Sequence, residues 1–124
     1  MKSVLFSEKA PAAIGPYSQG ICAGECIFVS GQLPVDVKTG ALGADIAEQT
    51  RLSLENLRSI LESKGLTMDD IVKTTVFMTD LGSFAAMNEV YGTFFEGDYP
   101  ARSTVQVAAL PKGAAVEIEC IAKA

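Results

Sequence analysis

The chain has 124 residues, which is enough for one domain that buries roughly two thirds of its unfolded surface, and residues 1–124 are predicted to form a single domain. The formal net charge of −5, with Lys and Arg scattered among acids, disfavours a nucleic acid partner, because phosphate binding depends on clustered positive charge. No segment matches a signal-peptide core of about 7–15 apolar residues or a membrane span of ~20, so we expect a cytoplasmic protein without a membrane partner.

The chain contains three cysteines and no histidine. An odd number of cysteines without an export signal predicts reduced thiols instead of a disulfide framework. Without histidine, the imidazole ligands of common zinc sites and the Ser-His and Cys-His dyads of hydrolases are missing. Cys22 and Cys26 have the same strand parity and could face the same way, but no second pair completes a set of about four ligands, so no metal site is predicted.

The first half of the chain predicts three strands followed by a helix. The strands are predicted at residues 4–6, 17–23 and 26–32, the last two joined by a tight turn at 23–25. From Asp45 onward apolar residues recur at helical spacing, and Asp45 and Glu48 are spaced as in a capping box. Gly65 is predicted to end this helix.

The second half predicts a further helix among three strands. The strands are predicted at residues 71–78, 102–107 and 115–122. Ser83 is predicted to cap the helix, which ends near Gly97. One stripe of that helix carries Phe84, Met87, Tyr91 and Phe94. The segment 110–113, Leu-Pro-Lys-Gly, is interpreted as a hairpin turn between the last two strands.

The predicted order βββ-α-β-α-ββ describes an α+β fold with one six-stranded sheet. Two helices cover only one face of such a sheet, while the strands that contain Arg102 and Glu117 place apolar or small residues on both faces. Hydrophobic residues make up 48% of the chain, which is rich for a small domain. The uncovered face therefore needs a partner, and self-association with closed symmetry is the expected one.

Arg102 is a candidate anion-binding residue. Strand alternation sets Arg102, Thr104 and Gln106 on one side of the sheet, where the guanidinium is expected to be partly buried. A partly buried guanidinium needs an anion, and its planar fork matches a carboxylate in a bidentate pair. The more common alternative, on spacing alone, is an ion pair to Glu117 or Glu119 across the hairpin or across a subunit boundary.

Glu117 is a candidate general acid or base. It alternates with Val116 and Ile118 in an otherwise apolar strand, where desolvation would raise its pKa. The alternative is an exposed position on a sheet edge, which is the more common environment of a glutamate.

Other candidates lie near turns and in the second helix. Gly31, which follows Ser30 inside an apolar strand, indicates either a bulge or the close approach of a ligand to backbone. Tyr17 follows the rigid Gly-Pro turn and either directs its hydroxyl at a site or packs in the core. Asn88 is expected to form a hydrogen bond with a neighbouring loop.

Four separated motifs occur in order along the chain: APAAIGPYSQG, FVSGQLP, DIVKTTVFMTDL and YPARSTVQVAALPKGAAVEIECIA. With these motifs the chain resembles the RidA (YjgF/UK114) family over essentially its whole length. The resemblance implies a chorismate-mutase-like fold with a mostly antiparallel sheet and both helices on one face. It also implies a homotrimer with its sheets packed inward, active sites between subunits, and no metal or cofactor.

The resemblance further implies an enamine and imine deaminase. Such an enzyme hydrolyses 2-aminoacrylate, 2-aminocrotonate and their tautomers 2-iminopropanoate and 2-iminobutanoate, which are reactive products of pyridoxal-phosphate enzymes. The products are 2-oxoacids and ammonia. By the same resemblance, Arg102 holds the substrate carboxylate and Glu117 positions or activates water.

The remaining site residues also follow from the resemblance. Tyr17 and Ser30 match polar residues that hold water or the amino group, and Gly31 offers backbone to the substrate. Asn88 matches a recurrent family position. Thr104 stands where many members carry cysteine, at a position that contacts substrate through backbone.

Two other functions remain as alternatives. One is a non-catalytic module that binds a metabolite such as a 2-oxoacid and regulates a partner. The other, reported within the wider family, is ribonuclease activity or inhibition of translation. The acidic charge balance and the absence of a basic stripe with stacking aromatics disfavour it.

Overall fold

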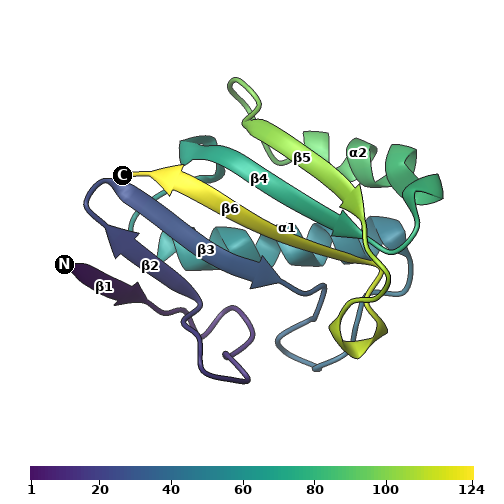
Figure 1. Cartoon of the computed structure of the whole chain (residues 1–124), viewed down its shortest axis with the longest axis horizontal. Coiled ribbons are helices and arrows are strands. Elements are labelled where there is room, and N and C mark those ends of the chain that lie inside the picture. The colour runs from purple at the N-terminus through teal and green to yellow at the C-terminus, as the bar shows by residue number, and fades with distance from the viewer.

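The structure, a computed structural model, describes residues 1–124 and contains six strands and two α-helices (Figure 1). The strands are β1 (Lys2–Leu5), β2 (Gly20–Ala23), β3 (Cys26–Gln32), β4 (Ile71–Met78), β5 (Ala101–Gln106) and β6 (Val116–Lys123). The α-helices are α1 (Ile46–Glu62) and α2 (Phe84–Gly92). The predicted order of strands and helices is therefore confirmed.

All six strands form one sheet in the order β1-β2-β3-β6-β4-β5. Every neighbouring pair is antiparallel except β4 and β5, which are parallel and are connected through α2. Both helices lie on the same face of the sheet (Figure 1). The α+β fold with a mostly antiparallel sheet is as predicted. Neither helix has the length and apolar character needed to cross a membrane.

The core lies between α1 and the centre of the sheet. Helix α1 begins where the carboxylate of Asp45 accepts a hydrogen bond from the backbone N–H of Glu48 at 2.9 Å, as the spacing predicted. It stops before Gly65, which adopts a left-handed conformation with φ of +78°. The fully buried apolar residues of this layer include Leu54, Leu57, Ile60 and Leu61 of α1 and Ile27, Val76, Met78, Val116 and Ile118 of the sheet.

The hairpin predicted at residues 110–113 is wrong. Strand β4 lies between β5 and β6, so the last two strands never pair. The α2 crossover returns the chain parallel to β4, and β5 takes the remaining free edge of the sheet. Pro111–Gly113 instead form a short 3-10 turn in which Lys112 has a positive φ of 60°.

The second helix is shorter than predicted. It ends at Gly92 and not near Gly97, and Phe94 therefore lies beyond the helix in the segment that leads to β5. Ser83 occupies the N-cap position but its side chain forms no capping hydrogen bond. The carboxylate of Asp80 caps the preceding 3-10 turn by accepting from the N–H of Gly82 at 2.8 Å.

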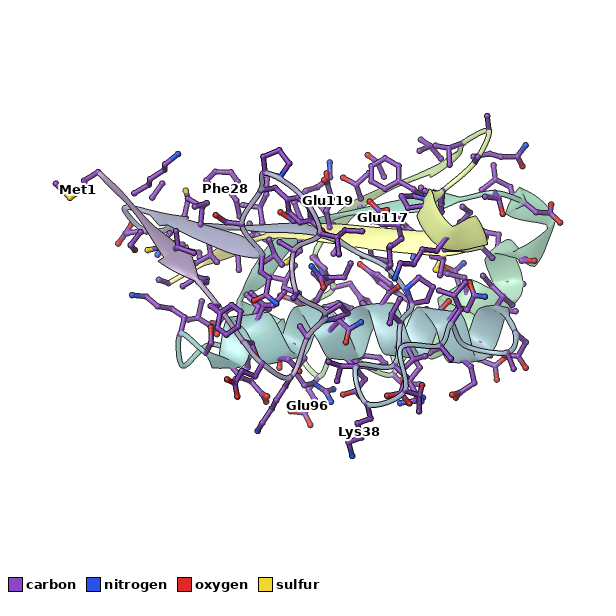
Figure 2. All side chains as sticks on the ribbon, turned by 90° about the horizontal axis from the view of Figure 1, so that it is seen from below. Met1, Phe28, Lys38, Glu96, Glu117 and Glu119 are labelled. Carbon is purple, nitrogen blue, oxygen red and sulfur yellow. The ribbon has the colours of Figure 1, made fainter.

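The opposite face of the sheet is not covered by any element of the chain, as the helix count predicted. Figure 2 shows Phe28, Glu117 and Glu119 on the side that faces away from α1. Large apolar side chains remain exposed on this face, among them Val105 at 42%, Phe28 at 44% and Val72 at 49%. Exposed apolar side chains on an uncovered sheet face are typical of a surface that binds another protein.

Candidate active site

Glu117 lies on the uncovered face of the sheet. In β6 the side chains of Val116, Ile118 and Cys120 are buried under the helices, and those of Glu117 and Glu119 alternate with them. The predicted alternation is confirmed. Because β6 is a central strand, Glu117 is half-buried among its neighbours and is not an exposed residue on a sheet edge.

A cavity of about 460 Å³ opens beside Glu117 on this face. Tyr17, Ser30 and Gly31 also line it, so the structure brings these four predicted site residues together. The polar and charged residues that line the same cavity, and that sequence reasoning missed, are Gln19, Gln32, Lys112 and Glu119.

Ser30 and Gly31 form a bulge in β3. Val29 pairs with Cys120 and Gln32 pairs with Ile118, so β3 carries one residue more than β6 between these two pairs. A Cβ atom at Gly31 would collide with the carboxylate of Glu117, lying only 2.8 Å from its Cδ atom. The bulge, one of the two predicted alternatives, is confirmed. The Glu117 side chain lies against the Gly31 backbone, and the approach of a ligand to Gly31 stays a prediction.

The hydroxyl groups of the cavity are held by local backbone. The Ser30 hydroxyl donates a hydrogen bond to the carbonyl of Ser18 at 2.7 Å. The Tyr17 side chain is 50% exposed, and its oxygen accepts a long hydrogen bond of 3.4 Å from the N–H of Ile14. Tyr17 therefore does not pack in the core, and both oxygens retain lone pairs for a water or a ligand.

Gln19 fixes the loop that carries Tyr17. Its side-chain oxygen accepts from the N–H of Ser7 at 2.7 Å, and its amide donates to the carbonyl of Pro11 at 2.9 Å. Gln19 is 3% exposed, so these bonds are shielded from water. A lone glutamine before a strand gives no sequence signal for this role.

Burial raises the pKa of the Glu117 carboxyl, and the negative charge of Glu119 raises it further. Both acids line the same cavity, where Lys112 is the one basic side chain. No hydrogen bond or ion pair of the chain stabilises the ionised form of Glu117. A carboxyl group in this environment exchanges a proton closer to neutral pH than an ordinary glutamate does.

Arg102 lies on the other face of the sheet, at its β5 edge. A second cavity of about 450 Å³ is lined by Arg102, Asn88 and Tyr91 together with Gly92, Tyr99 and Pro100. The Arg102 guanidinium carbon lies 4.8 Å from the centre of the Tyr91 ring. The ion pairs of the chain are Arg51–Glu48, Arg58–Glu55 and Lys123–Glu25, so Arg102 has no acidic partner.

Asn88 and Thr104 differ in their access to this second cavity. Asn88 lines it, and its side chain forms no hydrogen bond with a neighbouring loop, contrary to the prediction from sequence. The Thr104 hydroxyl is buried inside the chain without a hydrogen-bond partner and lines neither large cavity.

Arg102 and Glu117 do not meet within one chain. Thr74 of β4 pairs with Arg102, and Phe77 of β4 pairs with Glu117, so the two residues lie on strands that flank β4 and on opposite faces of the sheet. The alternative of an ion pair across a hairpin to Glu117 or Glu119 is therefore wrong for contacts inside one chain.

No group of three His, Cys, Asp or Glu side chains in the chain could hold a metal ion. The possible alignment of Cys22 with Cys26 is wrong. Cys22 pairs with the buried Ile27 across the β2–β3 hairpin, so the adjacent Cys26 points to the opposite face of the sheet.

The comparison with known proteins agrees with this architecture. Residues 7–124 match the model of the family described as endoribonuclease L-PSP. The chain is 52% identical to the reactive intermediate deaminase TdcF of Escherichia coli, over 98% of this chain and 97% of that protein. It is also 52% identical to the 2-iminobutanoate/2-iminopropanoate deaminase of Salmonella typhimurium, over 98% of each. A crystal structure of E. coli TdcF with bound serine superposes with a TM-score of 0.96, at 50% identity over 98% of each chain.

The fold and the two cavities define a single-sheet α+β protein with a protonatable carboxyl on one face and an unpaired guanidinium at one edge. Together with the match over nearly the whole chain, they identify its family. The chain belongs to the RidA family, as its four sequence motifs indicated.

Replacing Glu119 with glutamine should lower the pKa of Glu117, because the substitution removes the negative charge that raises it and leaves burial unchanged. The measurement is an NMR titration of the Glu117 side-chain carboxyl carbon. Glu96→Gln is the control, because Glu96 lies on the far side of α1 in Figure 2 and should not affect the titration. An unchanged Glu117 titration in Glu119→Gln would contradict the electrostatic coupling of the two acids.

Proposed function

We propose that the chain is an enamine and imine deaminase that hydrolyses 2-iminopropanoate, 2-iminobutanoate and their enamine tautomers to 2-oxoacids and ammonia. The observation that carries the proposal is the pair of complementary groups at the two cavities, a guanidinium without an acidic partner and a carboxyl with a raised pKa. The names of the two relatives at 52% identity support the same reaction. In this proposal the enzyme needs no cofactor.

Arg102 is the proposed anchor for the substrate carboxylate. A free guanidinium offers two parallel N–H groups to a carboxylate, and charge-assisted bonds of this kind contribute ~1.5–3 kcal/mol each. The serine bound in the related TdcF structure is likewise a small molecule with a carboxylate. Asn88, in the same cavity, is proposed to bind the substrate beside Arg102. The Thr104 backbone is proposed to contact the substrate from β5.

Glu117 is the proposed proton carrier. In its protonated form it donates a proton to the imine nitrogen, and water then attacks the carbon of the C=N bond. The carboxylate takes a proton from the attacking water, which gives a neutral carbinolamine. Glu117 then returns that proton to nitrogen, and its carboxylate takes the proton of the carbinolamine hydroxyl as the C–N bond breaks. Ammonia and the 2-oxoacid are released, and Glu117 is protonated again. Tyr17 and Ser30 are proposed to hold the water, and the Gly31 backbone to contact the substrate.

The proposed assembly is a homotrimer with the uncovered sheet faces packed inward and with each site between two chains. Arg102 and Glu117 lie on opposite faces within a chain, so a site that uses both must take them from different chains. The apolar side chains exposed on the uncovered face support such packing. The three free cysteines agree with the cytoplasm as the place of action.

Removing either group should abolish most of the activity. In a coupled assay, threonine dehydratase acts on threonine and the protein accelerates the release of 2-oxobutanoate. Arg102→Ala should lower kcat/KM roughly a hundredfold through the lost anchor. Glu117→Gln should lower it about a hundredfold or more through the lost proton transfer. Arg58→Ala is the matched control, since Arg58 also lies over an aromatic ring but lines neither the cavity of Arg102 nor that of Glu117. Undiminished acceleration by Arg102→Ala would contradict the proposal.

Two inactive variants should complement each other when their chains mix. The Arg102→Ala chain keeps Glu117, and the Glu117→Gln chain keeps Arg102. A site between two such chains is therefore complete when the first supplies Glu117 and the second supplies Arg102. Random mixing of equal amounts should therefore restore about a quarter of the sites. The measurement is deaminase activity after the two variants are unfolded and refolded together, with native mass spectrometry to verify mixed trimers. Mixed trimers without activity would show that one chain supplies both residues.

A further inference from the structure

The guanidinium of Arg102 lies against two aromatic rings of α2. Its central carbon is 4.8 Å from the centre of the Tyr91 ring and 5.4 Å from that of the Phe84 ring. Both distances are within the range of cation–π attraction. The Arg102 side chain forms no ion pair within the chain, so its N–H groups remain free for a ligand.

Tyr91 itself is rigidly held. Its side chain is 4% exposed, and its hydroxyl forms a buried hydrogen bond of 2.7 Å with the hydroxyl of Thr74, which is fully buried. Thr74 is the direct neighbour of Arg102 in the parallel ladder between β4 and β5. The hydroxyl pair therefore ties α2 to the strand next to Arg102 and sets the height of the Tyr91 ring relative to the guanidinium.

The Tyr91 hydroxyl keeps its proton. Burial raises the pKa of Tyr91, and the hydrogen bond to Thr74 and the charge of Arg102 only partly offset this effect. Tyr91 therefore does not become a phenolate that would neutralise Arg102. The ring supplies a platform, and the positive charge remains available to an external anion.

We propose that Tyr91, fixed by Thr74 and assisted by Phe84, is a positioning residue that holds the Arg102 guanidinium ready for the substrate carboxylate. An unsupported arginine side chain loses rotamer freedom when it binds, and a platform that orders it beforehand lowers that cost. The inference rests on the proposed role of Arg102 and deepens it. The strength of carboxylate binding then depends on the rings of Tyr91 and Phe84 and on the buried hydrogen bond between the hydroxyls of Tyr91 and Thr74.

Replacing Tyr91 with leucine should weaken binding and spare the chemical step. The carboxylate is unchanged from substrate to product, so a looser anchor raises KM and leaves kcat within about twofold. Both KM in the coupled assay and the dissociation constant of 2-oxobutanoate by calorimetry should rise about tenfold. Tyr91→Phe keeps the ring but removes its hydrogen bond to Thr74, so it should weaken 2-oxobutanoate binding by only about threefold, less than Tyr91→Leu.

The matched control is Phe94→Leu. The guanidinium of Arg58 lies 4.8 Å from the centre of the Phe94 ring, so this substitution removes an equivalent contact outside the cavity. It should leave both constants unchanged. Phe84→Leu provides a second test that does not endanger folding, because Phe84 is on the surface of α2, and it should weaken binding about threefold.

A double substitution separates this inference from the proposed function. If Tyr91 acts through Arg102, adding Tyr91→Leu to Arg102→Ala should weaken 2-oxobutanoate binding no further. If Arg102→Ala weakens binding but Tyr91→Leu and Phe84→Leu, both folded, bind normally, the positioning role is wrong and the anchor stands. If Arg102→Ala binds normally, the anchor itself is wrong, and the positioning role fails with it.

Discussion

The pleat of the β-sheet is the constraint on which the site depends. Successive side chains of a strand point to opposite faces, so each strand assigns its residues to one face or the other. In this chain the Glu117 side chain of β6 points to the uncovered face, and the Arg102 side chain of β5 points to the face that α2 covers. No side-chain rotation joins them, because β4 and the thickness of the sheet lie between. Catalysis that needs both groups therefore needs at least two chains.

Each half of the site is prepared by its own local structure. On the uncovered face, the bulge at Ser30 and Gly31 leaves room for the Glu117 carboxyl beside the backbone. Burial and the negative charge of Glu119 raise the pKa of that carboxyl. On the other face, α2 presents aromatic rings to a guanidinium that has no anion of its own. The group for proton transfer and the group for anion binding thus lie in separate cavities of one chain. In the proposed trimer, Glu117 of one chain and Arg102 of a neighbouring chain form one site.

Sequence reasoning succeeded where the information is local. Alternation along β6 predicted the environment of Glu117, the Asp45 cap predicted the start of α1, and Gly31 indicated the bulge. It failed where pairing is decided by distant segments. The segment 110–113 has the composition of a hairpin turn. However, β5 pairs with β4, because the connection through α2 places β5 beside β4 and parallel to it.

The aromatic support of Arg102 was missed for the same reason. Phe84 and Tyr91 were correctly predicted on one stripe of a helix, but a helical stripe does not reveal which strand residue it meets. The Tyr91–Thr74 hydrogen bond joins residues that are 17 positions apart and becomes visible only in the folded chain. Likewise, no sequence pattern indicated that Lys112, with its positive φ, lines the cavity of Glu117.

A crystal structure of the protein with bound 2-oxobutanoate would show whether two chains share the site. We expect a trimer in which the ligand carboxylate pairs with Arg102 of one chain while the oxo carbon faces Glu117 of its neighbour. A ligand bound to Glu117 with Arg102 turned to solvent, or a site completed within a single chain, would contradict it.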